Sequence, residues 1–245
     1  MNDWFGTLFV LSLRHVLGQR RVLLVLLLAL VPIAAAGIFF GWGRRDPADW
    51  TANVLGNGVV ISAVVPLATL LLGTAVFGSE IEDGTLVYLL SKPLPRWGIV
   101  LAKALAAFFP IALLLSLSSL LSGLLATWEE PLIRVTLALA ASAMVAAAGY
   151  VAVFVALSLV TSRAMIVGLA YAFIWEGAVT SFLSGAQYLS VRQYALGVFD
   201  ALAGLPDRTF DEALPSAPLL AAAVIAGALL LATRRLERWE VKGGE

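Results

Sequence analysis

The chain has 245 residues, of which 61% are hydrophobic and only 13% are charged. A typical soluble domain is about 45 to 50% apolar and about 25% charged, so this composition excludes a soluble enzyme, a disordered tail and a nucleic-acid binder. Sixteen Lys and Arg residues balance sixteen Asp and Glu residues, and the lack of cysteine excludes disulfides, thiolate metal sites and cysteine nucleophiles. We therefore expect an all-α integral membrane protein.

Six stretches between charged residues are long enough for a membrane-spanning helix. A span needs roughly 20 apolar residues in one helix, because every backbone amide must be satisfied inside the hydrocarbon. Pro32, Pro66 and Pro110 fall inside such stretches and predict kinks. The six predicted spans are residues 22–43, 54–78, 104–127, 135–161, 164–183 and 214–233.

Six spans would place both termini on one side of the membrane, and the basic residues indicate which side. Eleven of the sixteen Lys and Arg residues fall in the terminal segments, the second-to-third connection and the fourth-to-fifth connection, against five in the remaining connections. We therefore expect both termini in the cytoplasm and a multi-pass protein of the cell (inner) membrane.

The N-terminal segment, residues 1–21, combines aromatic and aliphatic residues with Arg14, His15, Arg20 and Arg21. This pattern predicts an interfacial helix on the cytoplasmic side, with no role beyond anchoring the chain. His15 is the only histidine, so a histidine-based metal site would have no second imidazole.

The connection 79–103 carries the most information, because it is expected in the cytoplasm and is too long for a simple turn. Three carboxylates come first, then a glycine, three leucines at helical spacing and a break with two prolines. These residues are Glu80, Glu82, Asp83, Gly84, Leu86, Leu89, Leu90, Pro93 and Pro95. A short helix between two breaks suits docking into a groove on another protein, although the carboxylates alone could be a solvated charge run.

Two sets of polar residues lie inside the predicted spans. Ser116, Ser119 and Ser122 share one face of the third span, where hydroxyls can line a path, bond across helices or, more often, bond their own backbone. Glu176 is the single ionisable side chain within a span, and a charge there costs roughly 2.5 to 3.5 kcal/mol. It is therefore a candidate for function, with a hydrogen-bonded structural carboxyl as the alternative.

The external connection 184–213 contains apolar residues on one face of a helix. They run from Val191 through Ala195 and Phe199 to Leu205, and Gly204 to Asp207 ends the pattern. This predicts an amphipathic helix that lies at the outer interface or caps the bundle.

The connection 79–103 also resembles a known family, the ABC-2 type permeases, which are membrane subunits of ATP-binding cassette transporters. The resemblance rests on an acidic residue, a Gly-Thr pair, a Leu-Leu-Ser-x-Pro stretch, an arginine and a lysine that leads into the next helix. These are Glu80, Gly84, Thr85, Leu89, Leu90, Ser91, Pro93, Arg96 and Lys103. Ala102 departs from the pattern, since the family more often has glycine there.

The resemblance implies a permease subunit, an exporter by expectation, whose coupling contact consists of Glu80, Glu82, Asp83, Gly84, Thr85, Leu89, Leu90, Pro93, Arg96 and Lys103. It implies that a separate ATPase subunit binds ATP and Mg, and that a second copy of this chain or a related permease completes the transporter. No catalytic, cofactor or metal site is expected in this chain, and its remaining partners would be membrane lipids. An ion-coupled secondary transporter using Glu176 and an ATPase-driven anchor acting on an extracytoplasmic partner remain alternatives.

Overall fold

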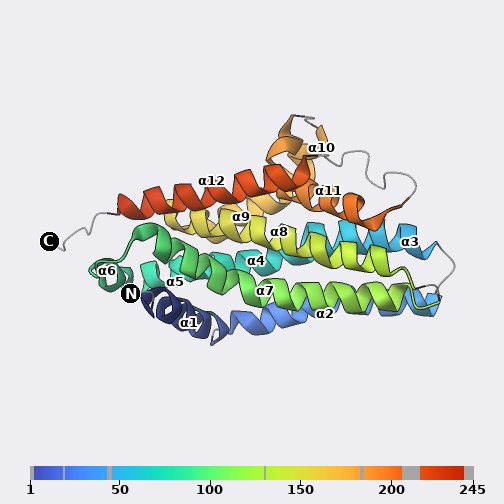
Figure 1. Ribbon diagram of the computed structural model, residues 1–245, viewed down its shortest axis with the longest axis horizontal. Helices are drawn as coiled ribbons and strands as arrows, with labels where there is room; N and C mark the ends of the chain where they lie inside the picture. Colours follow the sequence, from blue (N-terminus) through green and yellow to red (C-terminus); the bar gives the residue numbers. More distant parts are fainter. Residues whose placement is uncertain are drawn as a thin grey trace.

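The computed structural model describes residues 3–18, 20–42, 46–129, 131–182, 185–205 and 216–239. These residues form helices and connecting turns without any strand, so the predicted all-α class is confirmed for the part of the chain described. The helices run side by side along the length of the molecule (Figure 1). Residues 206–213 of the predicted external connection and the first two residues of the predicted sixth span lie outside the described ranges.

Among the described residues, five helical stretches are long and apolar enough to cross a membrane. The second is one continuous run built from a short α-helix, a π-helix and two further α-helices. The stretches are α2 (Arg21–Trp42), then α3 (Pro47–Asp49) with η1 (Trp50–Val64), α4 (Val65–Gly73) and α5 (Ala75–Glu82), then α7 (Arg96–Ala126), α8 (Ile133–Val160) and α12 (Ala217–Glu237).

The remaining helices are shorter. They are α1 (Asp3–Leu17), α6 (Leu86–Leu90), α9 (Ala164–Ala170), η2 (Tyr171–Val179), α10 (Thr180–Phe182), η3 (Ala186–Leu189) and α11 (Val191–Ala203). The predicted fifth span corresponds to α9, η2 and α10, of which the apolar part Ala164–Val179 is shorter than the five long stretches. Five candidate spans are therefore present where six were predicted.

Two predicted boundaries differ from the structure for local reasons. The second long stretch begins at Pro47 and not at residue 54, because the Asp46 carboxylate accepts a hydrogen bond from the Ala48 amide and proline suits the first helical position. The third begins at Arg96 and not at residue 104, directly after Pro95. Arg96 and Lys103, which the sequence placed in a loop, therefore lie on the helix α7.

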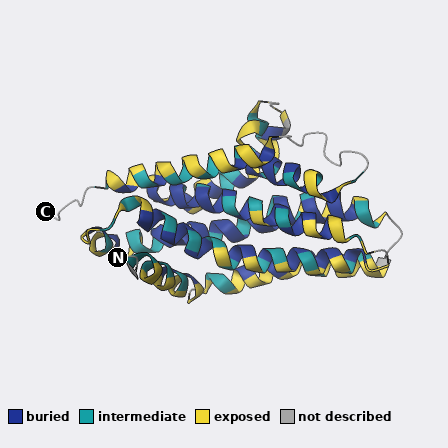
Figure 2. Cartoon of the chain, in the orientation of Figure 1, coloured by how far each residue is buried: buried dark blue, intermediate teal, exposed yellow. Residues whose placement is uncertain are grey.

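The core lies around α8, where small residues allow close helix contacts. A Cβ atom on Gly123 of α7 would come within 2.9 Å of Thr136 on α8, and one on Gly149 of α8 would come within 2.7 Å of Val191 on α11. Figure 2 shows buried residues gathered in the middle of the bundle, whereas α12 and the outer side of α2 are largely exposed. These outer faces are apolar, as expected for surfaces that meet lipid or another membrane helix.

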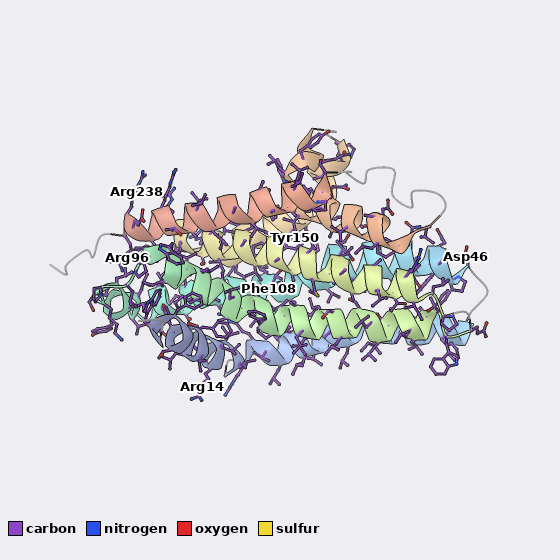
Figure 3. All side chains as sticks on the ribbon, viewed as in Figure 1. Arg14, Asp46, Arg96, Phe108, Tyr150 and Arg238 are labelled. Carbon is purple, nitrogen blue, oxygen red and sulfur yellow. The ribbon has the colours of Figure 1, made fainter. Side chains whose placement is uncertain are left out.

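The start of α1 and the end of α12 lie at the same end of the bundle as α6 (Figure 1). In Figure 3 Arg14, Arg96 and Arg238 are found at this end and Asp46 at the opposite one. Residues near the chain ends, on α5 and in the α8–α9 turn also line one common pocket, which brings Arg21, Arg163 and Trp239 together. We call this the terminal end of the bundle.

The helix predicted in the external connection is present as α11, and Val191, Ala195 and Phe199 of its apolar face are buried. Gln193 and Tyr194 are buried as well, so α11 is enclosed on more than one side. Of the two predicted placements, the structure favours a helix packed into the bundle against α8 and α12 over one lying flat at the interface.

Candidate functional site

The connection between α5 and α7 is a helical hairpin at the terminal end. The α5 helix ends at Glu82, and Gly84 has φ +68°, a left-handed conformation that side chains disfavour. The Thr85 amide then donates to the carbonyl oxygen of Glu80 at 2.9 Å, which closes the turn before α6 begins at Leu86. The Gly-Thr pair of the sequence motif is therefore the turn that separates α5 from α6.

A salt bridge joins the two long helices on either side of this hairpin. Lys103 Nζ of α7 lies 2.5 Å from Glu80 Oε1 of α5, donates to the Val76 carbonyl oxygen at 3.1 Å and sits 4.9 Å from the centre of the Phe77 ring. Lys103 is only 2% exposed, so water competes little for its charge. The pair ties α5 to α7, and Lys103 is not itself available to a partner protein.

The short helix α6 is held from both sides. Leu86 and Leu90 are buried in the core of the chain, and Arg96 donates a hydrogen bond of 3.0 Å to the Leu90 carbonyl oxygen. Leu89 is only partly buried and packs against the same core. The apolar face predicted to dock onto another protein therefore anchors α6 to its own chain instead.

Other side chains of the hairpin face outward. Tyr88 is 75% exposed and Val87 beside it is also exposed. The remaining exposed residues at this tip include Glu82, Asp83, Gly84, Thr85 and Pro93. The structure therefore presents an acidic turn followed by an aromatic and an aliphatic side chain.

Glu176, the candidate inside a predicted span, is 2% exposed and accepts three hydrogen bonds. Its Oε2 atom accepts from the Ser190 hydroxyl at 2.5 Å and the Arg192 amide at 3.2 Å, and its Oε1 atom accepts from the Val191 amide at 2.9 Å. These amides are the first of α11, where the helix dipole favours a negative charge. Glu176 is thus the cap that joins η2 to α11.

Three residues of this cluster were missed by the sequence reasoning. The Arg192 guanidinium donates to Asn57 Oδ1 of η1 at 2.8 and 3.1 Å, and Ser190 Oγ accepts from the Gln193 amide as the N-cap of α11. The Ser-x-x-Gln spacing before an apolar helix was a usable signal for Ser190. Nothing local could reveal Asn57, which is 135 residues from Arg192.

The serines of the third span are mainly structural. Ser116 and Ser122 donate to backbone oxygens three residues earlier in α7, and the Ser118 hydroxyl donates across to the Ala29 carbonyl oxygen of α2. The buried Ser119 hydroxyl has no hydrogen-bond partner among the described residues. Of the four serines Ser116, Ser118, Ser119 and Ser122, only Ser119 thus has a hydroxyl without a partner among the described residues.

Metal-ligating side chains do not gather anywhere in the part of the chain that is described: no group of three or more His, Cys, Asp or Glu residues could hold an ion there.

Comparison with known proteins identifies the family. A family model described as ABC-2 family transporter protein matches residues 19–185, more than half of the chain. This range includes the α5–α6 hairpin, the salt bridge and Glu176. No curated protein matches the chain. The matched range and the helical architecture together show that the chain belongs to the ABC-2 family of transporter proteins, as a membrane component of that class.

Proposed function

We propose that this chain is the permease subunit of an ATP-driven exporter and that a separate ATPase subunit docks at the terminal end. The observation that supports this most directly is the rigid attachment of α6. Buried leucines and the Arg96 hydrogen bond fix α6, while the Glu80–Lys103 salt bridge joins the long helices beside it. A displacement of the tip would therefore move α5 and α7 together, because the salt bridge and the buried contacts of α6 connect them.

The docking surface in this proposal is the exposed tip of the hairpin, defined by Glu82, Asp83, Val87 and Tyr88. An aromatic and an aliphatic side chain next to two carboxylates match a groove with an apolar floor and a basic rim. Glu80, Leu90, Arg96 and Lys103 then act as positioning residues that hold the tip.

The complete transporter in this proposal contains two copies of the chain, or one copy and a related permease. Each copy would cross the membrane six times, with α9, η2 and α10 as the fifth crossing and the terminal end in the cytoplasm. The ATPase subunits would bind ATP and Mg, and the protein would lie in the cell (inner) membrane.

The test is co-purification with a P-loop ATPase encoded beside this chain, followed by measurement of ATP hydrolysis in the complex. Tyr88→Ala should weaken retention of the ATPase at least tenfold, as expected for a central aromatic contact worth about 2 kcal/mol or more. Tyr188→Ala is the matched control, because Tyr188 is also exposed and lies in η3, away from the hairpin. Equal retention by both variants would contradict the proposed docking surface.

The same preparation separates the other functions that the sequence allowed. A secondary transporter would move substrate in vesicles without any ATPase. A mechanical anchor would stimulate ATP hydrolysis without substrate crossing the bilayer.

A further inference from the structure

Two pockets meet on one side of the bundle, between α2, the α4–α5 stretch and α9. One lies at the terminal end, has charged and hydroxyl side chains among apolar ones and has a volume of about 360 Å³. The other also has a volume of about 360 Å³ and is lined entirely by leucine, valine and methionine side chains. Met165 lines both pockets, so the two adjoin; we call the pair the groove, with the first pocket as its polar part and the second as its apolar part.

Each of the three helical stretches contributes to both parts in the same order. On α2, Arg21 lines the polar part and Leu24 to Val31 line the apolar part. On α4–α5, Thr74 and Gly78 line the polar part and Leu67 to Leu71 the apolar part. On the third side, Arg163, which directly precedes α9, lines the polar part, and Leu169, one turn after Met165 on α9, lines the apolar part. The groove is therefore amphipathic along its length.

The polar part has a net positive lining. Arg21 comes from α2 and Arg163 from the α8–α9 turn, Glu82 is the one acidic residue among its lining residues, and Trp239 lines it as well. Neither arginine forms an ion pair with any described residue. The hydroxyls of Thr74, Ser79 and Ser158 are already engaged with carbonyl oxygens of their own helices. The two guanidinium groups therefore remain as donors for an anion.

The length of the whole groove along α2, from Arg21 in the polar part to Val31 in the apolar part, fits one membrane leaflet. Arg21 and Val31 are ten residues apart on one helix, which corresponds to about 15 Å at about 1.5 Å per residue. The hydrocarbon core is about 30 Å thick, so one leaflet contributes about half of that. A tryptophan and two arginines at the polar end are also typical of the headgroup layer.

We propose that this groove binds one anionic phospholipid from the leaflet on the side of the terminal end. Its phosphate lies between Arg21 and Arg163, and one acyl chain lies along α2, α4 and α9. The lipid is bound by charge at one end and by apolar contact at the other. Glu82 belongs to both this site and the proposed ATPase docking surface, whereas Val87 and Tyr88 of that surface do not line the groove.

The proposal is tested on the full chain purified in detergent and titrated with dioleoyl phosphatidylglycerol, with bound lipid counted by native mass spectrometry. Dioleoyl phosphatidylcholine is the zwitterionic comparison. We expect selective retention of phosphatidylglycerol. Arg21→Gln and Arg163→Gln should each weaken it about fivefold, since a basic residue near an anionic lipid contributes on the order of 1 kcal/mol. Arg20→Gln, one residue outside the groove, should have no such effect.

The apolar part is tested with a matched pair on α2. Leu27 lines the groove and Leu30 does not, and both are exposed. Leu27→Trp should fill the groove and reduce retention of phosphatidylglycerol, whereas Leu30→Trp should leave it unchanged. Equal binding of both lipids, equal loss with Arg20→Gln, or no difference between the two tryptophan variants would each overturn the proposal. It would also be overturned if Leu27→Trp dissociated a dimer without changing lipid retention, because the groove would then be an interface between copies.

Discussion

Replacing Glu176 with glutamine tests whether this carboxylate holds α11 in place or acts in transport. The side chain accepts from Ser190, Val191 and Arg192 through both of its oxygens. Glutamine keeps the size but has one acceptor oxygen, so its amide group must face at least one donor. A hydrogen bond to a charged group contributes about 1.5 to 3 kcal/mol, and a charge at a helix N-terminus adds about 0.3 to 1 kcal/mol. Relief of the buried charge offsets part of this, and we expect a net loss of about 2 kcal/mol in the docking of α11.

The loss of stability should be confined to α11, so the assay is hydrogen exchange of the α11 amides in the detergent-solubilised chain. A change of 2 kcal/mol corresponds to about thirtyfold faster exchange where α11 opens independently of the rest of the bundle. Glu129→Gln is the control, because Glu129 is exposed outside the helices. Unchanged exchange in α11 together with lost transport would refute the capping role and assign Glu176 directly to the transport path.

Two further predictions concern the terminal end. Lys103→Met leaves the carboxylate of Glu80 without its cation and should lower thermal stability by about 2 kcal/mol or more. The double variant, which also carries Glu80→Gln, should recover most of this loss. If Lys103→Met is as stable as the parent protein, the pair contributes little to stability. Gly98→Ala places a Cβ atom 2.3 Å from the ring of Trp4 and should release α1 from α7, which would be measured as faster proteolysis within α1. Gly78→Ala is the control and should not change proteolysis, because there is open space around a Cβ atom at Gly78.

The helical class and the long apolar stretches could be predicted from the sequence because lipid requires each backbone amide to be satisfied within one helix. The helix α11 was predictable from the spacing of its apolar residues. The predicted helix boundaries were less accurate where polar residues lie inside helices. Lys103 looked like the end of a loop, since a lone lysine is normally solvated, and only its pairing with Glu80 allows α7 to begin at Arg96.

The coupling motif shows a different limit of sequence reasoning. Leu86, Leu89 and Leu90 have the spacing of a docking face, and the same spacing also suits a helix packed on its own chain. Which of these two roles the leucines have depends on how α5 and α7 position α6 in the fold. In the structure Leu86 and Leu90 are buried and Tyr88 is exposed. A five-residue helix has no room for two apolar faces of equal size, so its anchor and its exposed contact must be different residues.

Glu80 and Glu176 have the same chemistry and were singled out for different reasons, yet both join separate helices. Glu80 is paired with a lysine from the next long helix, and Glu176 accepts from the Ser190 hydroxyl and the first two backbone amides of α11. Each carboxylate therefore joins two helices that are separate in the sequence, α5 to α7 for Glu80 and η2 to α11 for Glu176. In a bundle with few polar contacts, such links are the points where movement of one helix must either be transmitted or break a charged hydrogen bond. Since breaking a hydrogen bond to a charged group costs about 1.5 to 3 kcal/mol, we expect α5 with α7, and η2 with α11, to move as pairs.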